Sequence, residues 1–161
     1  FADFLAARTR EGESLKHVFL KNCENILEIV GDVEKRMPEI HEHLRTKVQE
    51  RLETALAEAL TEKSTLSREE VSDRIRQEVT LYALRMDVSE EINRLRTHVR
   101  EVRATLEKGG VVGRRLDFMT QEMNREANTL GSKAAAIEMT QASIALKLNI
   151  DQMREQLQNL E

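Results

Sequence analysis

The chain has 161 residues, of which 34% are charged, 40% hydrophobic and 3% aromatic, with one proline and a net charge of −4. It lacks the valine- and aromatic-rich segments, separated by turn residues, that a β-sandwich or barrel requires. No apolar run reaches the roughly 18–20 residues of a transmembrane helix, and no signal segment opens the chain. We therefore expect an all-α protein with no membrane partner, and the single Cys23 suits a reducing cytoplasm.

Two helices are predicted in the first part of the chain. Apolar residues recur at helical spacings from residue 4 to about residue 37, and again from about residue 39 to residue 63. Pro38 disfavours helix in the residue before it and predicts a break or kink. Residues 1–65 are thus expected to form a long antiparallel helical hairpin arm. So thin an arm buries little surface, so partner helices are expected, either from the same chain or from another copy.

Residues 66–161 are predicted to form a C-terminal helical bundle. Ser67 with Glu70 and Asp87 with Glu90 are capping-box pairs that mark two helix starts. Gly109 and Gly110 end the second of these helices. A further helix spans about residues 114–130, and a last one follows Gly131.

Polar side chains form rows beside the apolar stripes of two of these helices. At about 100° per residue, Glu91, Arg94 and His98 lie within about 60° of one another. On the 114–130 helix, one side of the apolar arc carries Asp117, Gln121, Asn124 and Asn128, flanked by Arg114 and Arg125; the other carries Arg115, Glu122, Glu126 and Lys133. Asparagine lowers helix propensity, so these asparagines indicate polar partners.

Positive charge is concentrated between Arg94 and Arg115. This segment has seven basic and two acidic residues, a local charge of +5. Backbone amides at the start of the 114–130 helix, with Arg114 and Arg115 beside them, are compatible with a phosphate site. GGVVG (residues 109–113) is not a P-loop, and a simple turn between helices is the favoured explanation.

Acids, a histidine and arginines together support one coherent chemistry. Oxygen ligands suit Mg²⁺ or Mn²⁺, and His98 favours Mn²⁺. Such a metal activates water while arginines hold phosphate oxygens, which suggests phosphodiester hydrolysis. The alternative is that Glu91–Arg94 and Glu122–Arg125 are ordinary helix ion pairs.

Two segments then show a family resemblance. DVSEEINRLRTHV (residues 87–99) and GRRLDFMTQEMNREANTLGSK (residues 113–133) resemble the signature of the YicC/YloC family, and the ending IDQMREQLQNLE resembles its C-terminus. The resemblance implies a bacterial, cytoplasmic, Mn²⁺-dependent endoribonuclease that acts on RNA, without DNA specificity, and assembles as a homo-oligomer, a hexamer in the family.

The resemblance also suggests site residues. Glu91, His98, Glu122 and Glu126 are expected as metal ligands or general base, and Arg94, Arg114, Arg115, Arg125 and Lys133 as phosphate contacts. The supporting residues are Glu90, Asp117, Gln121, Asn124, Asn128 and Ser132.

One departure from the family pattern limits this expectation. The family has an N-terminal α/β domain that this sequence does not contain, so whether this part alone cleaves RNA is open. A helical scaffold or RNA-binding module without catalysis is the alternative, and an all-helical nucleotide pyrophosphatase fits less well. With so few aromatic residues, RNA recognition is expected to depend on phosphate rather than base stacking.

Overall fold

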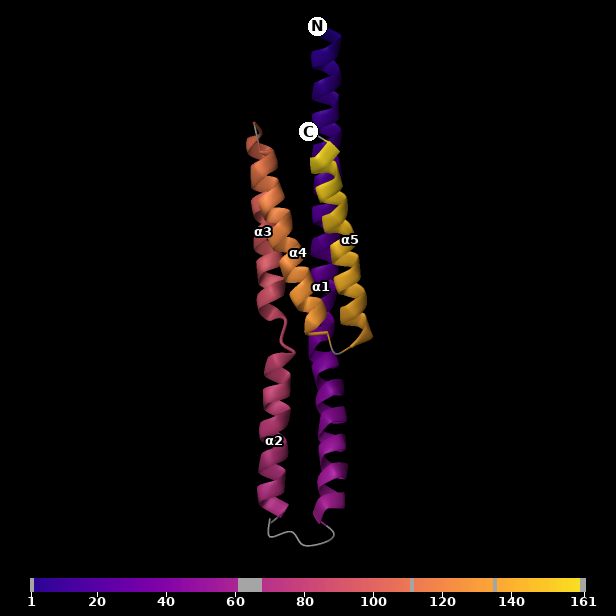
Figure 1. Ribbon diagram of the computed structural model, residues 1–161, viewed down its shortest axis with the longest axis vertical. Coiled ribbons are helices and arrows are strands. Elements are labelled where there is room, and N and C mark those ends of the chain that lie inside the picture. Colours follow the sequence, from indigo (N-terminus) through magenta and orange to yellow (C-terminus); the bar gives the residue numbers. More distant parts are fainter. Residues whose placement is uncertain (1, 61–67, 111, 135, 160–161) are drawn as a thin grey trace. The chain divides into compact units, whose positions relative to one another are not determined.

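The computed structural model of the chain describes residues 2–60, 68–110, 112–134 and 136–159. Every regular element in these ranges is an α-helix, which confirms the predicted all-α class. The helices are α1 (Ala2–Leu60), α2 (Arg68–Arg85), α3 (Ser89–Lys108), α4 (Gly113–Ser132) and α5 (Ile137–Asn159) (Figure 1). No described helix is both long enough and apolar enough to span a bilayer.

Contacts divide the chain into two units. The first, here called the bundle unit, consists of residues 1–34 and 88–161, and the second, the hairpin unit, consists of residues 35–87. This division differs from the predicted boundary at residue 65, because α1 contributes its two halves to different units.

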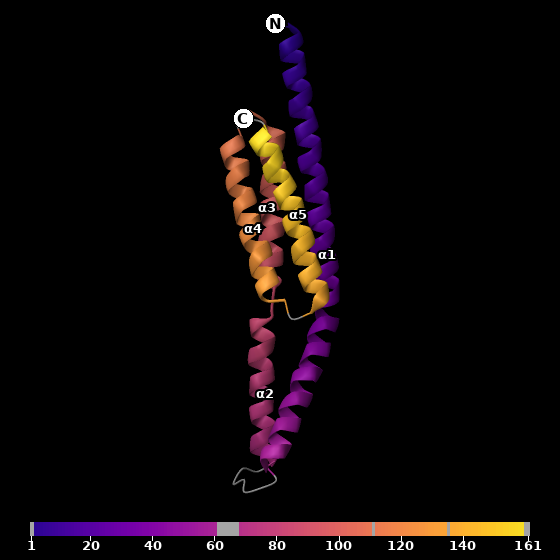
Figure 2. The ribbon, with the colours of Figure 1, turned by 45° about the vertical axis from the view of Figure 1, so that its right-hand side comes forward.

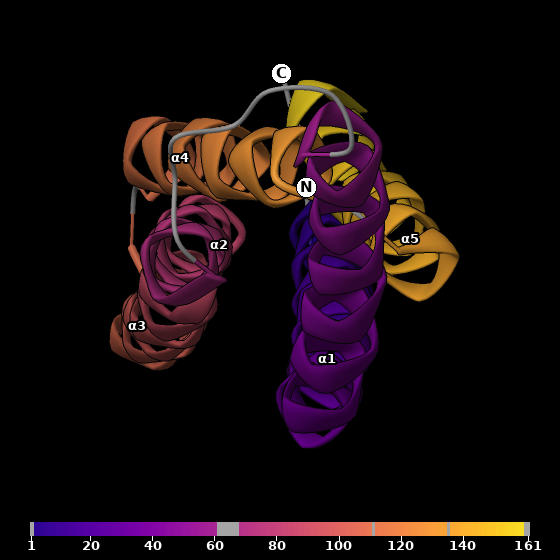
Figure 3. The ribbon, with the colours of Figure 1, turned by 90° about the horizontal axis from the view of Figure 1, so that it is seen from below.

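The bundle unit is built from the first half of α1 and from α3, α4 and α5. The last three alternate in direction along the chain, and α4 packs against both α3 and α5 (Figures 2 and 3). Asn25 on α1 donates a hydrogen bond of 3.1 Å to Asn149 Oδ1 on α5. Arg96 on α3 forms an ion pair with Glu34 on α1. The α1 segment is thereby tied to two of its neighbours.

The core of the bundle unit comes from one apolar stripe on each helix, as the spacing predicted. The buried side chains are Phe19, Cys23, Ile26, Val30 and Val33 from α1; Val88, Ile92, Leu95, Val99, Val102 and Leu106 from α3 and the residue before it; Leu116, Met119, Met123, Ala127 and Leu130 from α4; and Met139, Leu146, Ile150, Met153 and Leu157 from α5. Burial raises the pKa of the Cys23 thiol to about 11, and the Arg103 charge partly opposes this rise. The thiol therefore stays protonated and unreactive at neutral pH.

The hairpin unit pairs the second half of α1 with α2. Val79 and Tyr82 on α2 face His41 and Leu44 on α1 around a small cavity of about 10 Å³. The predicted arm pairs two helices separated at Pro38. The observed hairpin pairs the second half of α1 with α2, so the helices assigned to the arm are wrong.

Pro38 lies inside α1 without ending it, so the predicted break is wrong. A proline inside a helix removes one backbone hydrogen bond and costs about 3 kcal/mol. Met37 and Ile40, on either side of it, are both buried. Continued burial of the apolar stripe on both sides of the proline offsets that cost.

The predicted helix ends are partly confirmed. Gly109 follows α3 at φ 70°, and its N–H donates to Thr105 O; Gly110 has φ 84°, a region that favours glycine. At the other end of α3 the N-cap residue is Val88, with no side-chain cap, so the helix begins one residue later than the start predicted at Asp87. The box at Ser67 lies outside the described residues.

Gly131 marks a close approach of α4 to α5. A Cβ atom placed there would lie 2.6 Å from Ser143 Oγ and 3.3 Å from Ser143 Cβ. Ser143 Oγ donates a hydrogen bond of 2.9 Å to Ala127 O across the two helices. The helix pair can close only because residue 131 has no side chain.

We predict that Gly131→Ala destabilises the protein by about 1–3 kcal/mol, because overpacking outweighs the gain in helix propensity. Gly31→Ala is the control, since a Cβ there has no atom within 4 Å, and it should be neutral or stabilising. Denaturant unfolding measures both. Equal effects of the two substitutions would contradict the close approach.

Candidate functional site

The α3–α4 hairpin brings four of the predicted site residues together, namely Glu91, Arg94, Glu126 and Lys133. The turn at Gly109 and Gly110 reverses the chain, so the start of α3 lies opposite the end of α4. Ion pairs between the two ends confirm this register. Residues 87–99 and 113–133, which are distant in sequence, thus contribute to one face.

The best-defined contact on this face joins Glu91 and Lys133. Lys133 Nζ donates a hydrogen bond of 2.8 Å to Glu91 Oε1. The Glu91 side chain is only 3% exposed, whereas that of Lys133 is 30% exposed. The other carboxylate oxygen, Glu91 Oε2, is buried and has no hydrogen-bond partner among the described residues. Glu91 is therefore an almost fully buried anion with a cation as its nearest charge.

A second ion pair connects the two helices. Arg94 Nη1 lies 3.6 Å from Glu126 Oε1, and the Glu126 side chain is 7% exposed. Arg94 Nη2 also lies 3.7 Å from Glu90 Oε2, whose side chain is 78% exposed. Arg94 itself is 56% exposed. One arginine therefore serves a buried carboxylate on α4 and an exposed one on its own helix.

The other two predicted catalytic residues have local partners. His98 Nδ1 lies 3.4 Å from Glu101 Oε2, and Glu122 Oε1 lies 3.5 Å from Arg125 Nη1. Both contacts join residues three apart on one helix. The Glu122–Arg125 contact is the ordinary helix ion pair expected as the alternative, whereas Glu91 pairs with Lys133 rather than with Arg94.

The supporting residues on α4 also interact mainly with their own helix. Gln121 Nε2 donates to Asp117 Oδ2 at 3.0 Å, and Ser132 Oγ donates to Asn128 O at 3.0 Å. Asn124 Oδ1 is buried without a hydrogen-bond partner among the described residues. The side-chain oxygen of Asn124 is thus an acceptor without a donor in this part of the chain. This agrees with the expectation that an asparagine inside a helix has a polar partner to satisfy.

Arg114 and Arg115 are exposed in the first turn of α4. The α4 N-cap is Val112, which makes no side-chain cap. The predicted phosphate position at this turn stays a prediction.

The described side chains of this chain do not match a complete metal site. No three or more His, Cys, Asp or Glu residues among them are gathered closely enough to hold an ion. Glu91 Oε2, which has no hydrogen-bond partner among the described residues, could bind a further donor or ligand. However, the Lys133 ammonium contacts the same carboxylate and would repel a divalent cation. Within the described part of one chain, the four residues expected as ligands are therefore not gathered into one set.

Two further acids pair with residues of α3 and were not predicted to do so. Glu101 contacts His98, and its spacing of three residues could have indicated the pair. Glu34 pairs with Arg96 across α1 and α3. That contact could not be found from spacing, because it joins helices whose packing order the sequence does not reveal.

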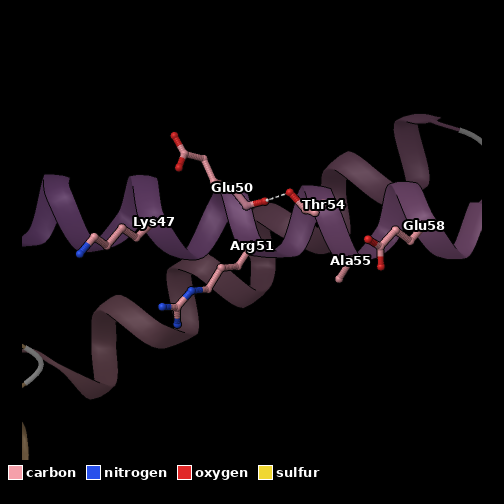
Figure 4. Close-up of a pocket in the computed structure, with 6 residues that line it drawn as sticks. All are labelled: Lys47, Glu50, Arg51, Thr54, Ala55 and Glu58. Atoms are coloured by element: carbon pink, nitrogen blue, oxygen red, sulfur yellow. Dashed lines mark hydrogen bonds between the residues drawn. The ribbon is translucent and has the colours of Figure 1, made fainter.

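The hairpin unit has a hollow of its own. A surface hollow of about 510 Å³ is lined by Lys47, Glu50, Arg51, Thr54, Ala55 and Glu58 of α1 (Figure 4). These side chains carry two positive and two negative charges and are exposed. None of them was predicted as a site residue, so this surface is a suitable control for the α3–α4 face.

Comparison with known proteins gives the class to which this fold and face belong. Residues 33–161 match the family described as "Endoribonuclease YicC-like, C-terminal". The chain therefore belongs to the YicC-like endoribonuclease family, which confirms the resemblance seen in the two motifs.

Two relatives are similar over almost the whole chain. A protein named "Probable endoribonuclease YicC" from Haemophilus influenzae is 42% identical over 159 residues, covering 99% of this chain and 52% of the relative. Its namesake from Clostridioides difficile is 33% identical over 154 residues, covering 96% of this chain and 50% of the relative. The chain spans about half the length of these curated relatives.

We predict that Lys133→Met destabilises the protein by about 2–3 kcal/mol, because it leaves the Glu91 carboxylate buried without its cation. Arg125→Met is the matched control, since it breaks a pair in which Arg125 is 74% exposed, and it should cost less than about 0.5 kcal/mol. Adding Glu91→Gln to Lys133→Met should recover much of the loss. Equal destabilisation by the two single variants in denaturant unfolding would contradict the role of burial.

Proposed function

We propose that the complete protein is an endoribonuclease that hydrolyses RNA phosphodiester bonds, and that the α3–α4 face binds the RNA backbone. The observation that supports this most is that two cations on this face, Arg94 and Lys133, are each paired with a buried carboxylate. The names of two relatives, both probable endoribonucleases, agree with it.

The composition of the chain favours backbone recognition. The four phenylalanines and one tyrosine offer few platforms for base stacking. Lysine and arginine side chains that reach solvent bind phosphate oxygens by charge-assisted hydrogen bonds. On this proposal RNA affinity falls steeply with salt, because phosphate contacts release counterions.

The proposal includes a divalent cation, Mn²⁺ rather than Mg²⁺, acting in hydrolysis when bound. We assign none of its ligands to Glu91 or Glu126, because each already faces a cation. His98 and Glu122 stay candidates, to be completed by groups outside the described residues of one chain. The homo-oligomer and the cytoplasmic location implied by the family resemblance also stay predictions.

A scaffold without catalysis is the competing function, and cleavage decides between the two. The complete protein is incubated with a labelled structured RNA in Mn²⁺ or in EDTA. We expect discrete fragments with Mn²⁺ and intact RNA with EDTA. Intact RNA under both conditions, with binding retained, would support the scaffold.

The role of the face is tested with paired charge removals. We predict that Arg94→Gln with Lys133→Gln lowers the cleavage rate at least about tenfold, because two phosphate contacts are lost. The matched control removes one lysine and one arginine from the hairpin unit, Lys47→Gln with Arg51→Gln, and should leave the rate within twofold. Equal losses in the two double variants would contradict a specific role for the α3–α4 face.

A further inference from the structure

Two carboxylates in the site are almost completely buried. Glu91 and Glu126 are 3% and 7% exposed at their side chains, while their cationic partners, Lys133 and Arg94, are 30% and 56% exposed. Each pair thus has an anion on the core side and a cation that reaches solvent. Both pairs lie at the same end of the α3–α4 hairpin.

The neighbouring acids on the same helices show a different arrangement. Glu90 is 78% exposed, although it is adjacent to Glu91 and pairs with Arg94. Glu122 is one helical turn before Glu126 and pairs only with the exposed Arg125 among the described contacts. Burial therefore distinguishes Glu91 and Glu126 from acids that merely balance surface charge.

A buried carboxylate that faces a cation can fix the position of that cation. An ammonium has three donors and a guanidinium five, so contact with the buried carboxylate does not use all of them. A side chain held in this way loses less conformational freedom when it binds a phosphate, which favours binding. The same contact takes the carboxylate away from metal coordination, because a divalent ion would have to displace the cation.

The geometry points to Glu91 and Glu126 as positioning residues that hold Lys133 and Arg94 against the RNA phosphodiester backbone, rather than as metal ligands. This inference rests on the proposed function and names the phosphate contacts of its site. Glu91 acts on RNA only through Lys133, and Glu126 only through Arg94. The two pairs form an anchored cationic row across α3 and α4.

A double-mutant cycle on RNA affinity tests the positioning role. Binding of a labelled structured RNA to the complete protein is measured in EDTA, so that neither metal nor cleavage contributes. We expect Lys133→Gln to weaken binding about fivefold with Glu91 present and less than twofold in the Glu91→Gln background. In the Glu90→Gln background, the matched control, the loss should again be about fivefold.

Two results would overturn the inference. Additive effects of Glu91→Gln and Lys133→Gln would show that Glu91 does not act through the lysine. A larger loss in the Glu91→Gln background would show that the carboxylate competes with phosphate. If circular dichroism shows that a Glu91 variant does not fold, the double-mutant cycle of Glu126→Gln and Arg94→Gln replaces it. The same two results would then overturn the inference. If the wild type binds RNA but neither cycle shows coupling, positioning fails and the proposed function stands.

Thermal unfolding with Mn²⁺ alone tests the metal half of the inference. The change in melting temperature that Mn²⁺ produces in the wild type should be the same in Glu91→Gln and in Glu126→Gln. A stabilisation by Mn²⁺ in the wild type that disappears in either variant would identify that carboxylate as a ligand and overturn the inference.

Discussion

Burial of Glu91 between α3 and the end of α4 is the constraint on which the candidate site depends. Burying a carboxylate that is 3% exposed costs free energy unless a cation and a hydrogen bond compensate it. Lys133 supplies both at 2.8 Å, and this fixes the end of α4 against the start of α3. Arg94 and Glu126 form a similar pair, but here the cation is on α3 and the carboxylate on α4. The two pairs together set the register of the hairpin.

The rest of the bundle unit maintains this register. The positive φ values of Gly109 and Gly110 allow the reversal between α3 and α4. The close approach at Gly131 brings α5 against α4, two residues before the lysine that contacts Glu91. Packing at the two ends of α4 therefore decides where the cations of the face lie. A substitution at Gly131 should change the position of Lys133.

Much of this was predictable from sequence, because helix periodicity alone separates core from surface. It predicted the apolar stripes of α3 and α4 and put Glu91 and Arg94 in one row. It failed at Pro38, since the penalty of one proline is local whereas the burial that offsets it comes from packing on both sides. It also could not show that Lys133 faces Glu91 or that Arg94 faces Glu126, because spacing on single helices does not reveal contacts with a neighbouring helix.

The central claim is that Lys133, held by Glu91, contacts RNA phosphate. Its most direct measurement is the rate of amine acetylation of Lys133 in the complete protein, followed by mass spectrometry with and without saturating RNA in EDTA. The account predicts that RNA slows modification of Lys133 at least about threefold more than that of Lys47, since a bound phosphate covers the ammonium. An unchanged rate at Lys133 under conditions in which the RNA is fully bound would contradict it.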